Sequence, residues 1–280
     1  MNDRTLKIVV VGACHVDRKA RAGRPLVAAA SNPVTLESCF GGVARNMAEN
    51  LCRLGVEVEL VTRLGHDGEG EALLAHLAAL PMGLAGVSRS EESPTAFHLI
   101  ALEPGGEMRL AVADMRIYDE ITPAVLRSLP ESLWAADAIL VDCNLPPETL
   151  AFLAGLRRPG RRFAAVGVSP AKVPRVAPCL AAFDVLCVNR GEAAALLGQP
   201  AAALDPLTAA TRLDDAGVGD VVVTLGAEGV CLASRGSRVQ LPSPQAVLQD
   251  VTGAGDALAA AFLEARLRGL DLAAAGRRAL

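Results

Sequence analysis

The chain has 280 residues, which is enough for one large α/β domain or two small ones with a sizeable core. Hydrophobic residues make up 51% and charged residues 21% of it, a composition typical of globular rather than disordered proteins. The formal net charge of −4 argues against nucleic acid or an acidic membrane surface as the main partner.

The cysteines and the N-terminal segment indicate the cellular compartment in which the protein is expected. Seven cysteines are scattered along the chain without a C-x-x-C pair, so we expect neither a disulfide framework nor a zinc site. The opening MNDRTLKIVVVG lacks the apolar region of a signal peptide, and no apolar run approaches the ~18 residues of a membrane span. We therefore expect a protein of the reducing cytoplasm that does not engage a membrane.

Apolar, strand-like runs alternate with helical patterns along the chain. In chain order we expect a strand at 6–13, a helix at 41–55 opened by two glycines, a strand at 56–65, a helix at 68–80, a strand at 137–143, a helix at 146–156, and strands at 162–169, 183–189 and 219–226. This alternation predicts an α/β fold whose mostly parallel sheet is covered on both faces. Ligands of such sheets bind beyond the carboxyl ends of the strands.

Two stretches depart from this alternation. Residues 15–40 are too polar and too rich in proline and glycine for a helix, and residues 95–115 read as a hairpin around EPGGE. Together they could form a small β-sheet that stands off the main body as a lid. The simplest organisation is a single domain over 1–280 with these two segments as its lid.

The stretch TGAGD, at 252–256, opens a helix rich in alanine and leucine. Its glycines permit positive φ, and the N–H groups of Gly253, Ala254 and Gly255 are unsatisfied donors at a helix N-terminus, which form an anion site. Asp256 would repel a phosphate unless a nucleophile lay between them, a geometry that suits a general base acting on a hydroxyl. Taken alone, the stretch is equally a glycine turn with an acidic capping residue, and it is not a Walker A loop.

Other motifs decide between these interpretations. They are GGVARNMAENLCRLG (41–55), LVTRLGHDGEG (60–70), NRGE (189–192), TLGAEGV (224–230) and DVTGAGDALAAAF (250–262). In this order and spacing they resemble the ribokinase-like (PfkB) family of carbohydrate and nucleoside kinases. Within it the chain is most similar to the pseudouridine kinases, through SNPV (31–34), GGEMRLAVADMRIYDEIT (105–122) and DCNLPPETL (142–150). The resemblance implies a three-layer α/β/α domain with a small β lid.

The resemblance also implies roles for single residues. Asp256 matches the catalytic base, and Gly253, Ala254 and Gly255 the anion hole. Asp17 and Asn46 match ligands of substrate hydroxyls, while Gly41 and Gly42 let a sugar approach a helix N-terminus closely. Asn189 and Glu192 match residues that organise Mg²⁺ through water. The resemblance also assigns four residues to the cofactor: Thr224, Gly226, Gly229 and Thr252.

Recognition of a base is expected to involve four further residues, Ser31, Asn32, Asp114 and Lys172. Each of them could equally be an exposed polar residue. His15 and His98 are predicted to be ordinary lid or turn residues, and Arg45 a solvated charge in the first turn of its helix. In the stretch VGVSPAK (166–172), which ends at Lys172, the Asp-Pro usual in the subfamily is missing.

These observations predict an ATP-dependent kinase that phosphorylates the 5′-hydroxyl of pseudouridine, with Mg²⁺ as cofactor and room for a monovalent cation. One alternative is the same chemistry on ribose or on another sugar or nucleoside. The other is a non-catalytic nucleoside-binding protein that has kept the fold. A small-molecule substrate, no nucleic acid and no membrane are the expected partners, and the lid could pair in a homodimer.

The end of the chain departs from the family pattern. Relatives continue beyond the helix that follows TGAGD with segments that help to wall the adenine site, whereas this sequence stops at Leu280. We expect the family fold to be truncated there, with lowered affinity for ATP but an unchanged reaction type.

Overall fold

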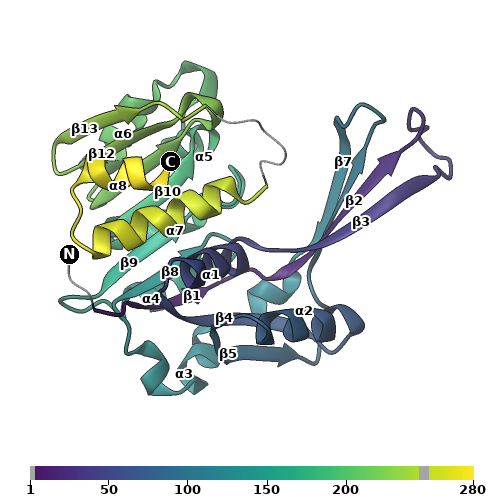
Figure 1. Ribbon diagram of the computed structural model, residues 1–280, viewed down its shortest axis with the longest axis horizontal. Helices are drawn as coiled ribbons and strands as arrows, with labels where there is room; N and C mark the ends of the chain where they lie inside the picture. The colour runs from purple at the N-terminus through teal and green to yellow at the C-terminus, as the bar shows by residue number, and fades with distance from the viewer. Residues whose placement is uncertain (1–3, 246–251) are drawn as a thin grey trace.

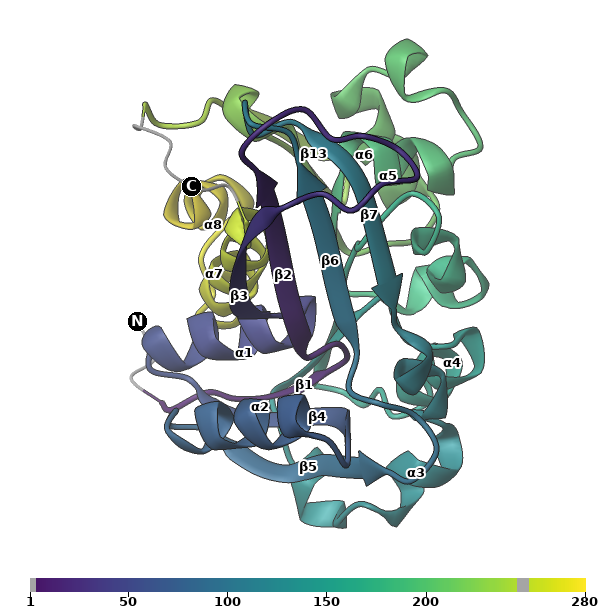
Figure 2. The same ribbon diagram turned by 90° about the vertical axis from the view of Figure 1, so that its right-hand side faces the viewer.

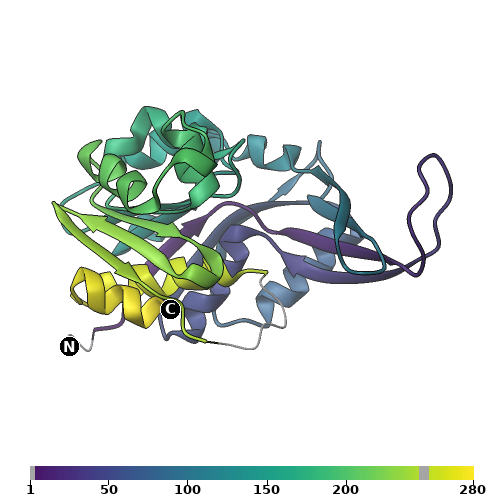
Figure 3. The same ribbon diagram turned by 90° about the horizontal axis from the view of Figure 1, so that it is seen from above.

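The computed structural model describes residues 4–245 and 252–280, so the residues just before TGAGD lie outside the described part. The chain forms two sheets (Figure 1). Nine strands make the central sheet, in the order β13-β12-β11-β10-β9-β8-β1-β4-β5, and four make the second, in the order β3-β2-β6-β7. The second sheet projects from one side of the main body, as the view from above shows (Figure 3).

The central sheet is parallel except at one edge. Seven strands run in parallel: β1 (Lys7–Val11), β4 (Glu57–Gly65), β5 (Gly83–Ser90), β8 (Ala138–Asp142), β9 (Arg162–Val166), β10 (Val185–Asn189) and β11 (Asp220–Thr224). The hairpin of β12 (Val230–Ser234) and β13 (Ser237–Leu241) adds two antiparallel strands beside β11. The inner strands are apolar throughout because helices cover both of their faces, and the predicted α/β class is confirmed.

Helices on the two faces bury two separate apolar clusters. One face carries α1 (Val43–Arg53), α2 (Gly68–Ala78), α7 (Ala254–Leu267) and α8 (Leu272–Ala279). The other carries α3 (Pro123–Ser128), α4 (Pro147–Ala154), α5 (Arg190–Leu196) and α6 (Pro206–Asp215), with short 3₁₀ turns at Arg116–Glu120, Glu131–Trp134, Val173–Ala182, Ala201–Ala203 and Gly226–Glu228. No helix of the described residues is long and apolar enough to cross a membrane.

The second sheet comes from the two stretches that interrupt the alternation. Its strands are β2 (His15–Ala22), β3 (Val34–Gly41), β6 (Phe97–Leu102) and β7 (Met108–Asp114), seen face-on in Figure 2. Side chains alternate between its two faces. Asp17, Lys19 and His98 lie on the inner face, with Asp17 and Lys19 directed at the start of α7, and the outer face carries exposed Leu36 and Leu110.

Candidate active site

The candidate site lies at the carboxyl edge of the central sheet, where β1, β8, β10 and β11 end. Asp142, the last residue of β8, is fully buried and accepts hydrogen bonds from the backbone N–H groups of Ala13, at 2.7 Å, Ala44, at 3.2 Å, and Asn144, at 2.8 Å. Burial raises the pKa of this carboxyl, against the lowering effect of Ala13, Asn144 and Lys172. Asp142 thus ties the end of β1 and the start of α1 to its own strand.

The N-terminus of α7 stands over this edge. Its capping residue, Gly253, has a φ of +77°, which a residue with a side chain adopts only at a cost. The first N–H groups of a helix have no intrahelical acceptor, and they carry the positive end of the helix dipole. Adjacent residues of this terminus line two different cavities, so an anion held here could be reached from both.

The first cavity has a volume of about 390 Å³ and lies toward the second sheet. Six of the predicted residues line it: Asp17, Gly41, Asn46, Thr252, Gly253 and Ala254. The second cavity, of about 190 Å³, opens along the ends of β9 and β10. Five others line it: Asn189, Glu192, Thr224, Gly255 and Asp256. The structure therefore gathers most of the predicted site at two neighbouring hollows.

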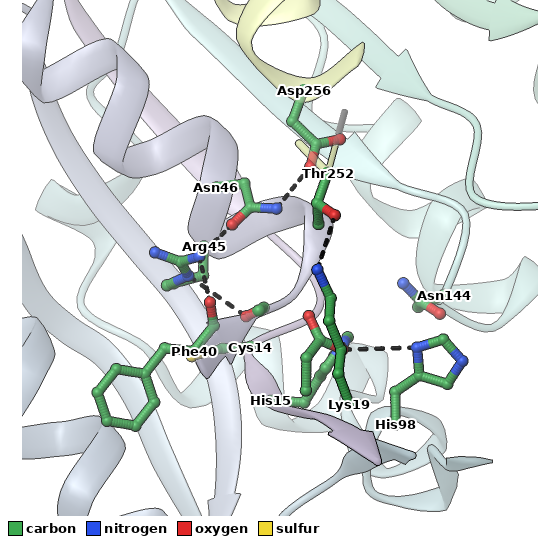
Figure 4. Close-up of polar contacts among 12 residues, drawn as sticks. Cys14, His15, Lys19, Phe40, Arg45, Asn46, His98, Asn144, Thr252 and Asp256 are labelled. Carbon is green, nitrogen blue, oxygen red and sulfur yellow. Dashed lines mark hydrogen bonds and ion pairs between the residues drawn. The ribbon is translucent and has the colours of Figure 1, made fainter. Parts of the chain in front are cut away.

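Asp256 lies in the first turn of α7 and is partly buried. Its Oδ2 accepts a hydrogen bond of 2.7 Å from the Nδ2 of Asn46, in α1 (Figure 4). Burial raises the pKa of Asp256 to about 6, and Asp142 and Glu192 add to the rise while Asn46 and Arg45 oppose it. A carboxylate with that pKa is ionised near neutral pH and still binds a proton well, as a general base requires.

Arg45 holds the amide of Asn46 in place. Its guanidinium donates to the Oδ1 of Asn46, to the carbonyl of Phe40 at 2.6 Å and to Oε2 of Glu49 at 2.5 Å. Only 9% of Arg45 is exposed, so the prediction of a solvated charge is wrong. The physical reason is that Glu49, one helical turn later, supplies a partly buried counter-charge on the same face.

Asp17 is the charged group that the second sheet contributes to the larger cavity, which Arg45, Glu49 and Arg53 also line. Its Oδ1 lies 3.3 Å from Nε2 of His15 and 3.5 Å from Nδ1 of His98. Burial alone would raise the pKa of Asp17, but the two imidazoles outweigh it and the net shift is downward. The carboxylate therefore stays ionised and can accept hydrogen bonds from hydroxyl groups. His15 and His98 are more than ordinary lid residues, because both contact Asp17.

The glycine pair before α1 has a specific packing reason. A Cβ on Gly41 would lie 1.9 Å from Oδ2 of Asp17, so the carboxylate occupies the space that a side chain would fill. Gly42 has a φ of +102°, and its Cβ would lie 2.3 Å from the carbonyl oxygen of Ala13. The two glycines therefore make room for the Asp17 carboxylate and for the backbone at the end of β1. The prediction from the sequence was that they make room for a sugar.

Asn189 and Glu192 form a capping box at the start of α5. The N–H of Glu192 donates to Oδ1 of Asn189 at 2.9 Å, and the N–H of Asn189 donates to Oε2 of Glu192 at 2.8 Å. Glu192 is only 3% exposed, and burial raises its pKa. A Cβ on Gly167 would lie 2.1 Å from Oε2 of Glu192, so this glycine makes room for the carboxylate.

A magnesium ion needs oxygen ligands and keeps several of its waters, with phosphates supplying the rest. The described residues include no group of three or more His, Cys, Asp or Glu side chains that could hold a metal ion. Glu192 nevertheless lines the cavity, and its Oε1 takes no part in the capping box, which uses Oε2. These residues fit an ion that is bound mainly by phosphate and water and is held by the protein indirectly.

The other residues predicted for the nucleotide side lie on the β11–β12 connection and beside the second sheet. Gly226, with a φ of +59°, and Gly229, with a φ of +99°, shape the turn after Thr224. A Cβ on Gly229 would lie 2.0 Å from the carbonyl of Leu241, so this glycine has a packing reason of its own. The Oγ1 of Thr252 accepts a hydrogen bond of 3.4 Å from Nζ of Lys19, which joins the lid to the α7 terminus (Figure 4).

The four residues proposed for base recognition are not brought together. Ser31 and Asn32 lie in the loop between β2 and β3, where the Asn32 side chain bonds to the backbone of Val27 and Ala30. Asp114 ends β7 and pairs with Arg116 at 2.6 Å. Lys172 differs from the other three because it lies at the carboxyl edge of the central sheet. Its Nζ donates to Oδ1 of Asn144 at 2.5 Å, just beyond Asp142.

Sequence reasoning missed Asp142, Asn144 and the pairing of Arg45 with Asn46. The available signal was position, since Asp142 and Asn144 follow a strand at the carboxyl edge of a parallel sheet, where ligands bind. Tyr118 was also missed: its hydroxyl donates to the carbonyl of Cys14 at 2.9 Å and lies 3.2 Å from Nδ1 of His15. No sequence pattern links residues so far apart.

Residues 5–280 match the family of pfkB carbohydrate kinases. The chain belongs to this family. An uncharacterised sugar kinase of Escherichia coli is 30% identical over 97% of this chain and 75% of its own length, and the pseudouridine kinase of the same organism is 28% identical over 95% and 85%. A carbohydrate kinase from Agrobacterium tumefaciens superposes with a TM-score of 0.82 at 33% identity, covering 98% of this chain and 88% of that one.

The family fixes the class of reaction. The protein is a phosphotransferase that acts on a hydroxyl group of a sugar or nucleoside. A ribokinase from Arabidopsis thaliana, solved with ribose and ATP, shares the fold with a TM-score of 0.83 at 23% identity, covering 99% of this chain and 90% of that one. The ribokinase-like fold inferred from the motifs is thus confirmed.

Proposed function

We propose that the protein transfers the γ-phosphoryl group of ATP to the 5′-hydroxyl of pseudouridine. One observation carries the proposal: Asp256, with its pKa raised to about 6, is held by Asn46 at a helix N-terminus between two cavities. The acceptor would occupy the larger cavity beside Asp17, and the phosphates would approach from the side of Glu192.

In the proposed step, Asp256 takes the proton of the acceptor hydroxyl as the new O–P bond forms. The bond between the γ-phosphorus and the bridging oxygen breaks, and ADP leaves with that oxygen. The first N–H groups of α7 donate to the equatorial oxygens of the transferring group, where charge is spread in the transition state. Asn46 orients the base, and Asp17 accepts hydrogen bonds from the other hydroxyls of the acceptor.

Cofactor use is part of the proposal. Ribokinases with this fold have been solved with ATP, from Arabidopsis thaliana, and with ADP, from Cryptococcus neoformans. Magnesium, when bound, would neutralise phosphate charge, with Glu192 and Asn189 placed to order its water ligands. A monovalent cation has no support among the described residues and stays a prediction, as does the cytoplasmic location.

The choice of acceptor rests on the pseudouridine kinase relatives and on the shared short motifs. Ribose is the second candidate, because a ribokinase of Bacillus subtilis is 26% identical over 96% of this chain. Asp17 and Asn46, the proposed ligands of hydroxyl groups, line the cavity, whereas Ser31, Asn32 and Asp114 do not, which supports recognition of the sugar part of the acceptor more than of the base.

A substrate panel read by ADP release tests the proposal. Pseudouridine should give the highest kcat/KM among pseudouridine, uridine, inosine and ribose. A clear preference for ribose would overturn the choice of pseudouridine and leave the kinase class intact. Nucleoside binding in calorimetry without any phosphoryl transfer would instead favour the non-catalytic alternative.

We also propose that two copies pair through their lids. The outer face of the second sheet exposes Val34 at 42%, Leu36 at 53%, Leu110 at 57% and Val112 at 44%. Apolar side chains gathered on one face of a sheet are costly in water. The inner face is instead polar around Asp17, so the outer face is the one available for pairing.

A further inference from the structure

A third cavity, of about 600 Å³, lies at the opposite edge of the central sheet from the candidate active site. Residues just before or at the start of β1, β8, β9 and β10 line it, with the last turn of α7 and the turn between β12 and β13. Its lining includes Arg4, Arg157, Arg158, Arg162, Arg235 and Arg266. Five-residue strands span about 16 Å, which separates the two edges.

The charge of this cavity is the reverse of that of the chain. Seven arginines and two aspartates line it, in a protein whose formal net charge is −4. Three of the arginines have carboxylate partners: Arg4 with Asp137 at 2.7 Å, Arg157 with Asp184 at 3.5 Å, and Arg266 with Asp220 at 2.8 Å. The other four have none within the described residues.

Arg161 is the buried member of this set, with 8% of its surface exposed. Its guanidinium donates to three backbone carbonyls, those of Leu156 at 2.8 Å, Ala136 at 3.4 Å and Trp134. Burial lowers the pKa of Arg161, and the charge of Arg158 lowers it further. Because a guanidinium does not lose its proton in proteins, Arg161 stays charged where it is buried. The free-energy cost of burying that charge remains until a negative charge lies nearby.

Arg235 has an unusual backbone conformation. It is one of two non-glycine residues with positive φ in the described part of the chain, at +46°. It precedes Gly236 in the two-residue turn between β12 and β13, a position that glycine, asparagine and aspartate favour. The turn is held by Asp214, which accepts from the N–H of Arg235 at 2.9 Å. Strain of this kind often marks a functional position.

We propose that this cavity binds a small phosphate-bearing anion at a site separate from the active site, with Arg158, Arg162 and Arg235 as its ligands. One guanidinium group can donate two parallel hydrogen bonds to two oxygens of a phosphate. The volume lies in the range of pockets for small molecules, and a concave site favours a compact ligand over a nucleic acid backbone or a membrane surface. The proposal does not depend on the acceptor of the kinase reaction.

Helix α7 joins this site to the catalytic edge. Asp256 stands in its first turn and Arg266 in its last, about 15 Å apart along the axis. The ligand would bind next to Leu267, the final residue of that helix. Anion binding at this site can be measured directly, without any phosphoryl transfer by the protein.

The test uses inorganic pyrophosphate as the probe and the full chain as the protein. Calorimetry and hydrogen–deuterium exchange should show saturable, salt-dependent binding, with protection of the backbone around 156–163. The double variant Arg158→Ala/Arg162→Ala should weaken that binding at least tenfold. The control Arg212→Ala/Arg277→Ala removes two exposed arginines outside the cavity and should leave the affinity within about twofold.

Arg235→Gly separates a binding role from a structural one. Glycine relieves the positive φ, so Tm without ligand should rise by about 1–3 °C, while pyrophosphate affinity falls. A merely structural arginine would change stability without affecting binding. The proposal is overturned if wild-type protein shows no saturable binding, if protection is confined to the start of α7, if the double variant binds as wild type does, or if only RNA or anionic vesicles bind.

Discussion

The side-chain amide of Asn46 donates to Oδ2 of Asp256 at 2.7 Å, joining residues 210 positions apart. The amide cannot turn round, because Arg45 donates to its oxygen and so fixes its nitrogen toward Asp256. Helix α1 therefore sets the orientation of a carboxylate on α7. That relationship makes the base and its positioning residue separately testable.

The first prediction concerns Asp256 itself. Asp256→Asn keeps an oxygen that can accept from Asn46 but cannot take a proton, so turnover should fall by about 10²–10⁴-fold. Acceptor affinity in calorimetry should stay within a few-fold of wild type. Turnover close to that of wild type would remove Asp256 from the role of base.

The same substitution should stabilise the protein in a pH-dependent way. The pKa of Asp256 is 3.8 unperturbed and about 6 in the folded protein, so its protonation supports folding below 3.8 and that support is lost as pH rises through 6. Asp256→Asn should therefore raise Tm at pH 8, where about 1–3 kcal/mol is recovered, and have little effect at pH 4. Equal shifts at both pH values would contradict the raised pKa.

The pH profile of turnover gives a third prediction. Since the ionised form of Asp256 is the active one, kcat/KM should rise with pH through an apparent pKa near 6 and then level. Asn46→Ala removes a hydrogen bond that lowers this pKa, so the rise should move to higher pH. Asn50→Ala, one turn along α1, is the control, because among the described residues its amide donates to the carbonyl of Asn46 and not to Asp256. An unmoved profile in Asn46→Ala would show that the pair does not set the pKa.

The sequence predicted much of this site because family motifs mark residues whose backbone roles are local. TGAGD predicted a helix N-terminus, which the structure has at Gly253. N-x-x-E was assigned to Mg²⁺ and water, and the capping box that Asn189 and Glu192 form was not foreseen, although it too is formed within a few residues. Contacts between distant elements were not readable. Arg45 looked solvated because its partner carbonyl at Phe40 comes from the end of the lid, and Asp142 gave no sign of the three backbone donors that surround it.

The same limit explains Ser31 and Asn32. The stretch SNPV was read as a base-recognition element, yet a short polar sequence is equally suited to closing a loop on itself, which is what Asn32 does. Strand register decides which lid residues face the active site. That register depends on pairing between β2 and β6, about eighty residues apart, so a motif of four residues does not reveal it.

Gly41 yields a prediction that isolates Asp17. A Cβ at Gly41 would lie 1.9 Å from Oδ2 of Asp17, so Gly41→Ala must displace that carboxylate. We expect kcat/KM for the acceptor to fall by about 10²-fold, mostly through KM, with little change in KM for ATP. Gly68→Ala is the matched control, because a Cβ there has no neighbour within 4 Å. Similar losses in both variants would show that the effect is not specific to Asp17.

The outer face of the lid leads to the last prediction. If two copies pair through Leu36, Leu110 and Val112, light scattering should give twice the chain mass of 28.9 kDa. Leu36→Glu puts a charge into that apolar contact and should yield monomers. Thr35→Glu, the adjacent residue of β3, adds the same charge to the opposite face and should leave the dimer intact. A wild-type monomer at high micromolar concentration, or a Leu36→Glu dimer, would exclude pairing through this face.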